Sequence, residues 1–414
     1  MIGLLAAAAI GTSGCGGPED DGKATLELWT MQLKPTFTDY IGNLIAEWEK
    51  AHPEADVVWT DLPASEIENK TLAAAASGQP PDLINLNPAF SNKLANAKAL
   101  TPITLTTAER EAYFEAAWEA NTMHGEVIGV PWYLSSSVTL FNTGLWKRAG
   151  LPVGEWPRTY RQLADASRVI KEKTGALGFM PPLGDRGKFM ELLAADGVPL
   201  LTEDGKAAAF AGPEGVRVLE FWLGLFEDGV IPQESLNQTH REAIDRFQAG
   251  QTAVFPAGPQ FLRIIEENSP KLYTQLAVGP QITGEAGKVG VSVMNLVIPK
   301  STEHPELARD LAFFLTSGEN QLAFSKLVPI LPSVKAAAAD PYFQAGEDAG
   351  LSEQARALAA EQLTRATLLV KPLPKQSELA RSLDEALQRA VLGHQSPEEA
   401  LKQAAKEWNQ LLGS

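Results

Sequence analysis

The N-terminal part of the chain alternates between two spacings of apolar residues, one typical of strands and one typical of helices. A short apolar run over residues 25–29 predicts a buried strand, and apolar residues at helical spacing follow it over 37–48. The same order recurs as a strand over 56–59, a helix over 64–76 and a strand over 82–86. This alternation predicts a parallel sheet with right-handed crossovers. Such sheets bind ligands beyond the carboxyl ends of their strands.

The rest of the chain continues the alternation. Further strands are expected over 138–142, 252–255 and 289–298, with amphipathic helices between them. The last helix has a clear start, because Ser396 stands at the N-cap position and Glu399 completes a capping box three residues later. At about 150 residues per domain, a chain of 414 residues holds two or three domains. We therefore predict an α/β protein with more than one domain.

Composition and charge narrow the possible partners. Hydrophobic residues make up 44% of the chain and charged residues 21%, which suits ordinary folded cores. The formal net charge is −16, and there is no long run of Lys or Arg to offset it. A phosphate backbone would be repelled by this field, so we expect no nucleic-acid partner.

The sequence lacks the common motifs of catalysis and of metal or nucleotide binding. The five histidines do not have metal-ligand spacing, and a single cysteine cannot form a Cys-based metal site. A Walker A loop, a dinucleotide fingerprint and a nucleophile elbow are also missing. We expect no catalytic residue, cofactor or metal. A glycosidase with paired carboxylates stays open as a distant alternative.

The N-terminus has the pattern of an export signal. The apolar run 2–10 would rise only about 14 Å as a helix, too short to span a bilayer, but its length suits a signal peptide. Four small residues then precede Cys15, and this arrangement resembles a bacterial lipobox. The resemblance implies a signal peptide over 1–14, a lipid on Cys15 and a polar tether over 15–23. The alternative is a plain secretory signal with an incidental cysteine.

Several segments resemble extracellular solute-binding protein family 1, the maltose-binding type of ABC transporter sugar-binding lipoproteins. The resemblance covers about residues 25–412, and the order and spacing of the segments carry it. The matching segments are 125–133, 139–142, 145–150, 156–160, 250–259, 295–300, 305–309 and 313–315.

The resemblance implies a type II periplasmic-binding-protein fold, with two discontinuous lobes joined by a multi-strand hinge. Lobe one would hold 24–131 and 290–327, and lobe two would hold 132–289 and 328–414. The chain would then be a monomeric, non-enzymatic binding component of an ABC importer. It would act outside the cytoplasm, anchored to the cell membrane or periplasmic. It would pass its ligand to the transmembrane permease subunits.

Four candidate ligand contacts follow the first and third predicted strands. Trp29 and Gln32 lie at the end of the first strand, and Asn85 and Asn87 lie at the end of the third. A sugar requires flat aromatic surfaces and side chains that hydrogen-bond to hydroxyl groups. Core packing for Trp29 and helix or turn capping for the asparagines are the alternatives.

The resemblance adds candidates near the hinge and in lobe two. Trp132 and Tyr133 follow the proline at the expected start of the hinge, so one of their rings is expected to face the ligand, together with Ser135. The family's loop before the helix around 188–195 supplies ligand contacts, which implies roles for Asp185 and Arg186.

The last candidates bear on the kind of ligand. Relatives often have Gly-Pro-Trp where this chain has Gly258, Pro259 and Gln260, so an aromatic platform for a long oligosaccharide is missing. Gln260 can still hydrogen-bond, and Asn295 is a further candidate. We favour a small carbohydrate. The alternative is glycerol 3-phosphate or a glycerophosphodiester, for which Arg186 would bind the phosphate.

Overall fold

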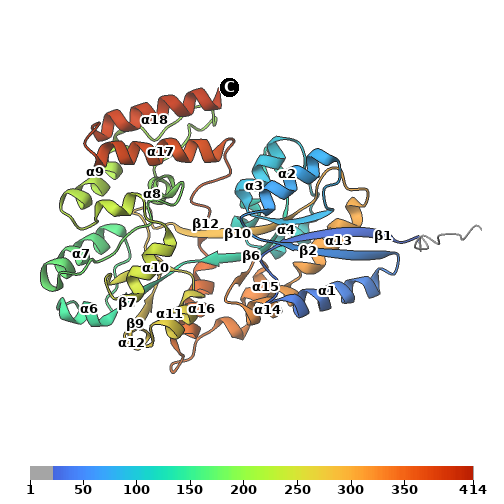
Figure 1. Cartoon of the computed structure of the whole chain (residues 1–414), viewed down its shortest axis with the longest axis horizontal. Helices are drawn as coiled ribbons and strands as arrows, with labels where there is room; N and C mark the ends of the chain where they lie inside the picture. Colours follow the sequence, from blue (N-terminus) through green and yellow to red (C-terminus); the bar gives the residue numbers. More distant parts are fainter. Residues whose placement is uncertain (1–21, 414) are drawn as a thin grey trace, which may run out of the picture.

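The computed structural model describes residues 22–413, which form two α/β bodies side by side (Figure 1). We call the body around the larger sheet lobe one and the body around the smaller sheet lobe two. The predicted signal peptide, Cys15 and most of the tether lie outside the described residues. Among residues 22–413, none of the helices has the length and apolar character needed to cross a membrane.

Lobe one is built on a seven-stranded sheet in the order β11-β6-β10-β3-β1-β2, with β12 paired to β10. The β1–β2 and β1–β3 pairs are parallel, as predicted, whereas β10 runs antiparallel to β3 and β6. The strands are β1 (Ala24–Met31), β2 (Ala55–Leu62), β3 (Leu83–Leu86), β6 (Val130–Ser136), β10 (Val289–Val297), β11 (Leu331–Pro332) and β12 (Ala366–Thr367).

Helices cover both faces of this sheet. Strand β1 buries Leu26 and Leu28 in a core shared with Trp48 of α1 and Leu311 of α13. A second core on the other side joins β3 to α3. The helices of lobe one are α1 (Thr38–Ala51), α2 (Ile67–Ser77), α3 (Pro88–Asn96), α4 (Thr107–Ala112), α5 (Glu115–Ala120), α13 (Pro305–Leu315), α14 (Gly318–Leu327) and α15 (Lys335–Ala338).

Strand β2 is the edge of the sheet, and two side chains cover its free side. The Glu49 carboxylate accepts a hydrogen bond from the Val57 N–H at 2.8 Å. The Lys34 ammonium donates to the Trp59 carbonyl at 3.3 Å. Two main-chain groups on this strand are therefore bonded to side chains of their own chain.

Lobe two contains a three-stranded antiparallel sheet in the order β8-β7-β9. Its core includes Phe141, Trp222 and Trp408, so the last helix packs against residues far away in the sequence. The strands are β7 (Val138–Asn142), β8 (Val254–Ala257) and β9 (Leu276–Gly279). The helices are α6 (Thr143–Arg148), α7 (Tyr160–Thr174), α8 (Lys188–Ala195), α9 (Pro213–Glu227), η1 (Gln233–Leu236), α10 (His240–Gln248), α11 (Phe261–Asn268), α12 (Pro270–Tyr273), α17 (Gln376–Val391) and α18 (Pro397–Leu412).

The chain passes repeatedly between the lobes, so each lobe is discontinuous. Strand β6 leads from lobe one into β7, and β10 returns from β9 into the large sheet (Figure 1). A third path leads from α14 through β11, η2 (Pro341–Phe343), α16 (Leu351–Leu363) and β12 to α17. The predicted α/β, two-lobed fold is thereby confirmed. The exact residue bounds of the lobes stay a prediction.

Candidate functional site

A β-bulge lies where β6 passes from lobe one towards lobe two. Tyr133 pairs with Met294 and Pro131 pairs with Asn295, which leaves Trp132 as the extra residue on β6. Both neighbouring rings lie against Phe324, with ring centroids 5.8 Å away for Trp132 and 5.9 Å away for Tyr133. Trp132 is fully buried, whereas Tyr133 is half-buried. Tyr133 is therefore the ring of this pair that a ligand can reach.

Beyond the bulge, β6 and β10 continue as a paired ribbon towards lobe two, with β11 beside β6 at residues 133–134 and β12 beside β10 at residues 289–290. Ser135 pairs with Ser292, and both side chains are exposed. Tyr133 and Met294 are the next pair along and are half-buried. We call these four residues the hinge face. Burial raises the pKa of Tyr133 to about 12, so its hydroxyl stays protonated and can donate a hydrogen bond.

Buried amides fasten the ribbon at the lobe-two end. The Gln362 side chain of α16 donates to the Ser137 carbonyl at 3.1 Å and accepts from the Gln281 N–H at 2.8 Å. The Gln281 side chain in turn bonds to both main-chain groups of Gly290, at 2.6 and 3.2 Å. These contacts hold the end of β6 and the start of β10 to lobe two.

A matching clamp holds β6 at the lobe-one end. The Ser333 hydroxyl donates to the Pro131 carbonyl at 2.8 Å, and the Gln321 amide donates to that hydroxyl at 2.8 Å. Gln321 and Ser333 are both buried. The two sets of contacts thus fix β6 at Pro131 and, just beyond its end, at Ser137.

The loop after β1 holds Gln32 in an unusual conformation. Gln32 has φ of +60°, in the left-handed region that non-glycine residues rarely adopt, and its side chain is exposed. The Asp61 carboxylate braces this loop, because it accepts from the N–H groups of Leu33 at 3.0 Å and Lys34 at 2.9 Å. Trp29 is half-buried and packs against the core around α3.

The three candidate asparagines of lobe one have structural partners. Asn87 is the N-cap of α3 and accepts from the Phe90 N–H at 2.9 Å. Asn85 and Asn295 are fully buried, and the Asn85 amide donates to the Asn295 carbonyl at 3.0 Å. The Asn295 side chain bonds to Ser91 at 3.1 Å and donates to Asn121. In this conformation a ligand cannot reach Asn85 or Asn295.

In lobe two, the candidate loop borders a polar cavity of about 310 Å³. Asp185 is fixed by accepting from the His240 N–H at 3.2 Å, whereas the Arg186 side chain is exposed at the cavity. We call this space the α17 cavity. Its lining comprises Leu183, Gly184, Arg186, Leu236, Asn237, Arg381, Asp384, Glu385 and Gln388. Two guanidinium groups, two carboxylates and two amides there can hydrogen-bond to hydroxyl groups.

The remaining predicted residues lie before α11. Gly258 precedes this helix, and an added Cβ there would collide with the Gln260 side chain. Gln260 itself is exposed. Neither residue lines the α17 cavity.

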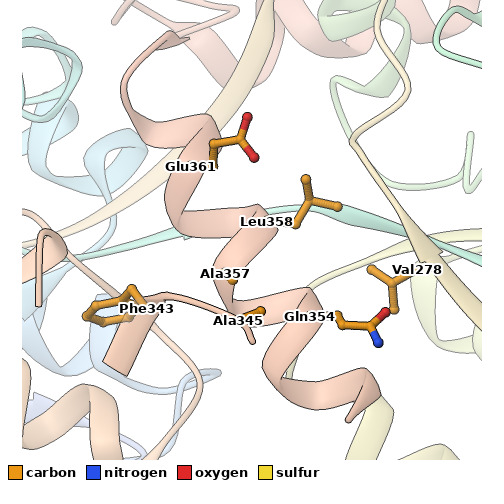
Figure 2. Close-up of a pocket in the computed structure, with 7 residues that line it drawn as sticks. All are labelled: Val278, Phe343, Ala345, Gln354, Ala357, Leu358 and Glu361. Atoms are coloured by element: carbon orange, nitrogen blue, oxygen red, sulfur yellow. The ribbon is translucent and has the colours of Figure 1, made fainter. Parts of the chain in front are cut away.

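A larger surface cavity of about 490 Å³ lies elsewhere, between β9, the segment after η2, and α16 (Figure 2). Gln354 and Glu361 are the polar side chains that reach it, among five apolar residues. None of the sequence-predicted residues borders it, so it is a weaker candidate than the hinge face and the α17 cavity. Among the described residues, no cluster of three or more His, Cys, Asp or Glu could hold a metal ion.

Sequence reasoning missed Ser292 and the three charged residues that α17 contributes to the cavity. Ser292 lies in an otherwise apolar strand, and only its pairing with Ser135 in the structure places it on the hinge face. Arg381, Asp384 and Glu385 have the polar pattern of an ordinary solvated helix face. Nothing in their local sequence signals a site.

Comparison with known proteins identifies the family. The family model for bacterial extracellular solute-binding proteins matches residues 34–322. The chain belongs to this family. It is therefore a solute-binding protein of a type that acts outside the cytoplasm.

Individual members of the solute-binding family resemble the chain over most of its length. The arabinooligosaccharide-binding protein of Halalkalibacterium halodurans is 24% identical over 325 residues, which are 76% of this chain and 72% of the relative. The galactooligosaccharide-binding protein of Bacillus subtilis is 23% identical over 419 residues, a match that covers 97% of this chain and 94% of the relative.

A solved structure agrees with both fold and family. A periplasmic-binding protein from Synechococcus sp. MITs9220, provisionally described as binding oligosaccharides, is 35% identical with a TM-score of 0.84. The match covers 94% of this chain and 99% of that structure. The predicted type II periplasmic-binding-protein fold is confirmed.

Proposed function

We propose that the protein is the substrate-binding component of an ABC importer and captures a small carbohydrate between its two lobes. The observation that carries this proposal is the hinge face. Its hydroxyl groups and the half-buried Tyr133 ring lie on the ribbon around which the lobes would close. Hydroxyl donors beside an aromatic ring match the chemistry of a sugar.

The α17 cavity would supply the lobe-two half of this site. The segment that leads from β12 into α17 runs along the side of lobe two turned towards lobe one (Figure 1). Arg186 lines this cavity, and Asp185 precedes it on the same loop. Closure of the lobes on a ligand would bring the α17 cavity towards the hinge face, and ligand binding would shift the population to the closed state.

The charges of the α17 cavity favour a neutral ligand over a phosphate. Arg186 and Arg381 would attract a phosphate, but Asp384 and Glu385 line the same space and would repel it. Hydroxyl groups of a sugar can accept from Arg186 and Arg381 and donate to Glu385, whose side chains are exposed. Glycerol 3-phosphate therefore stays the second candidate.

A thermal-shift panel tests the ligand class. The panel contains arabinotriose, galactotriose, maltotriose, diacetylchitobiose and glycerol 3-phosphate. A ligand present at a hundred times its Kd stabilises the native state by about 2.7 kcal/mol, which raises the Tm by several degrees. A shift with a sugar alone supports the proposal, and a shift with glycerol 3-phosphate alone overturns it. Chromatography of the recovered sugar tests the absence of hydrolysis.

The remaining partners follow from this role. We infer that the protein works as a monomer and delivers its ligand to permease subunits in the membrane. A lipid on Cys15 would hold it at the membrane surface, where it meets the permease.

A further inference from the structure

Helix α8, which follows the Asp185–Arg186 loop, begins without a capping side chain of its own. Its N-cap residue is Gly187, which has φ of +84° and no side chain to accept a hydrogen bond. The first N–H groups of a helix need an acceptor, and an uncapped start costs about 1 kcal/mol. The loop must therefore obtain its cap from elsewhere in the fold.

Asp384 of α17 provides this cap. Its carboxylate accepts from the Gly187 N–H at 2.8 Å and also from the Phe189 N–H. Helix α17 lies close enough that a Cβ on Gly187 would be 3.3 Å from the Ala380 methyl group. A negative charge at the start of a helix is also favoured by the helix dipole. The contact thus joins two helices that are far apart in the sequence.

We propose that Asp384 is a positioning residue for ligand capture, which holds the Asp185–Arg186 loop in place at the α17 cavity from the neighbouring helix. The inference rests on the proposed function, because it assigns ligand contact to the loop that Asp384 fixes. Asp384 Oδ2 bonds to the loop, and its Oδ1 is buried with no hydrogen-bond partner among the described residues.

The charges around Asp384 make its hold on the loop sensitive to pH. Burial raises the pKa of Asp384 to about 6, against the opposing effects of the Gly187 and Phe189 N–H groups and of Arg186. These three groups all stabilise the ionised form of Asp384. Because the interaction is mutual, the ionised form also stabilises the loop in its observed position.

Other charged groups face Asp384 from both sides of the cavity. Glu191 of α8 raises the Asp384 pKa, and Arg381 and Glu385 of α17 line the same cavity. The ionised carboxylate makes the stronger cap, since charge-assisted hydrogen bonds are about twice as strong as neutral ones.

Hydrogen–deuterium exchange tests the hold on the loop without any ligand. The measurement follows peptides that cover 184–190, as protection relative to intrinsic exchange, between pH 5 and pH 7. Asp384→Ala is expected to lower protection about tenfold at pH 7, a loss equivalent to about 1.4 kcal/mol of capping and charge. Asp384→Asn keeps an acceptor and should lower protection less, with no dependence on pH.

Glu378→Gln, an exposed carboxylate on the same helix, is the matched control and should behave as wild type across this pH range. Unchanged protection in Asp384→Ala would overturn the proposal.

A binding measurement tests the link to capture. The probe is whichever sugar of the panel gives the largest thermal shift. Asp384→Ala should bind it about ten times more weakly, because the charged acceptor is lost, and Asp384→Asn about three times more weakly, because a neutral acceptor remains. Equal affinities would overturn the capture role but leave the proposed function standing. If no probe binds, the proposed function fails, and exchange alone still decides whether Asp384 holds the loop.

Discussion

Ser135 of β6 lies directly opposite Ser292 of β10, on the exposed face of the ribbon that joins the two lobes. Successive side chains of a strand point to opposite faces of the sheet, so the neighbouring Ser136 points to the buried side. Its hydroxyl has no hydrogen-bond partner among residues 22–413. The ribbon thus presents two accessible hydroxyl groups to whatever enters between the lobes.

Replacing both exposed serines should weaken ligand binding. The double variant Ser135→Ala and Ser292→Ala removes two hydroxyl groups, each worth about 0.5–1.5 kcal/mol when bonded, so affinity should fall by about tenfold to a hundredfold. Isothermal titration calorimetry with the best sugar of the panel measures the change. Ser136→Ala is the matched control and should bind normally. Full affinity of the double variant would remove the hinge face from the site.

Loss of the Gln362 amide should destabilise the hinge. Gln362→Leu leaves the Ser137 carbonyl and the Gln281 N–H, both of half-buried residues, without these partners. Each unsatisfied group costs about 1–3 kcal/mol, so the free energy of unfolding should fall by about 2–4 kcal/mol. Urea denaturation checks this value. The exposed Gln354 on the same helix allows a control, since Gln354→Leu should change stability by less than about 0.5 kcal/mol.

Removal of the Asp61 carboxylate should release the loop that carries Gln32. Asp61→Ala breaks hydrogen bonds to the Leu33 and Lys34 N–H groups and to the Thr30 hydroxyl at 2.7 Å. Bonds to a charged acceptor contribute about 1.5–3 kcal/mol, so we expect a loss of about 2–3 kcal/mol in unfolding free energy. Asp56→Asn removes only an exposed ion pair with Lys23 and should cost about 0.5 kcal/mol or less. Equal effects of the two changes would contradict the bracing role of Asp61.

Asp384 should also shape the pH dependence of global stability. Its pKa is raised from 3.8 to about 6 in the folded state. Between these values the folded protein keeps a proton that the unfolded chain releases, so this group makes stability fall as the pH rises from about 4 to about 6. Denaturation of Asp384→Asn across this range should show a flatter profile than wild type. An unchanged slope would mean that the carboxyl group is not perturbed in this way.

The mature N-terminus should carry lipid on Cys15. Mass spectrometry of the protein from bacterial membranes should find a lipid-modified cysteine as the first residue. Cys15→Ala should move the protein to the soluble fraction. An unmodified Cys15 in wild type would favour the plain secretory signal.

Sequence patterns predicted the local structure well. The Ser396–Glu399 capping box is present as predicted, and Gly78 ends α2 in the left-handed conformation. At the start of α7, Thr159 and Gln162 form only half of such a box. Thr159 accepts from the Gln162 N–H, but the Gln162 side chain accepts from the Arg158 N–H instead of the N–H of the N-cap residue. Local signals thus placed the start of the last helix correctly.

The candidate site depended on contacts that sequence patterns do not encode. Gln32 and Asn87 do follow β1 and β3, but the strand-end rule could not show that Asn85 and Asn295 meet across β3 and β10 and bury each other. The cap that Asp384 places on α8 likewise joins distant parts of the chain. Such contacts form only when each lobe folds and brings distant parts of the chain together.

The covered edge of β2 affects whether two molecules of the protein can pair through their sheets. An open strand edge is a template for pairing with a second chain. Here Glu49 and Lys34 occupy main-chain groups of Val57 and Trp59, so a second molecule would have to displace both side chains before it could extend the sheet. This barrier disfavours intermolecular sheets where many copies of the protein are close together.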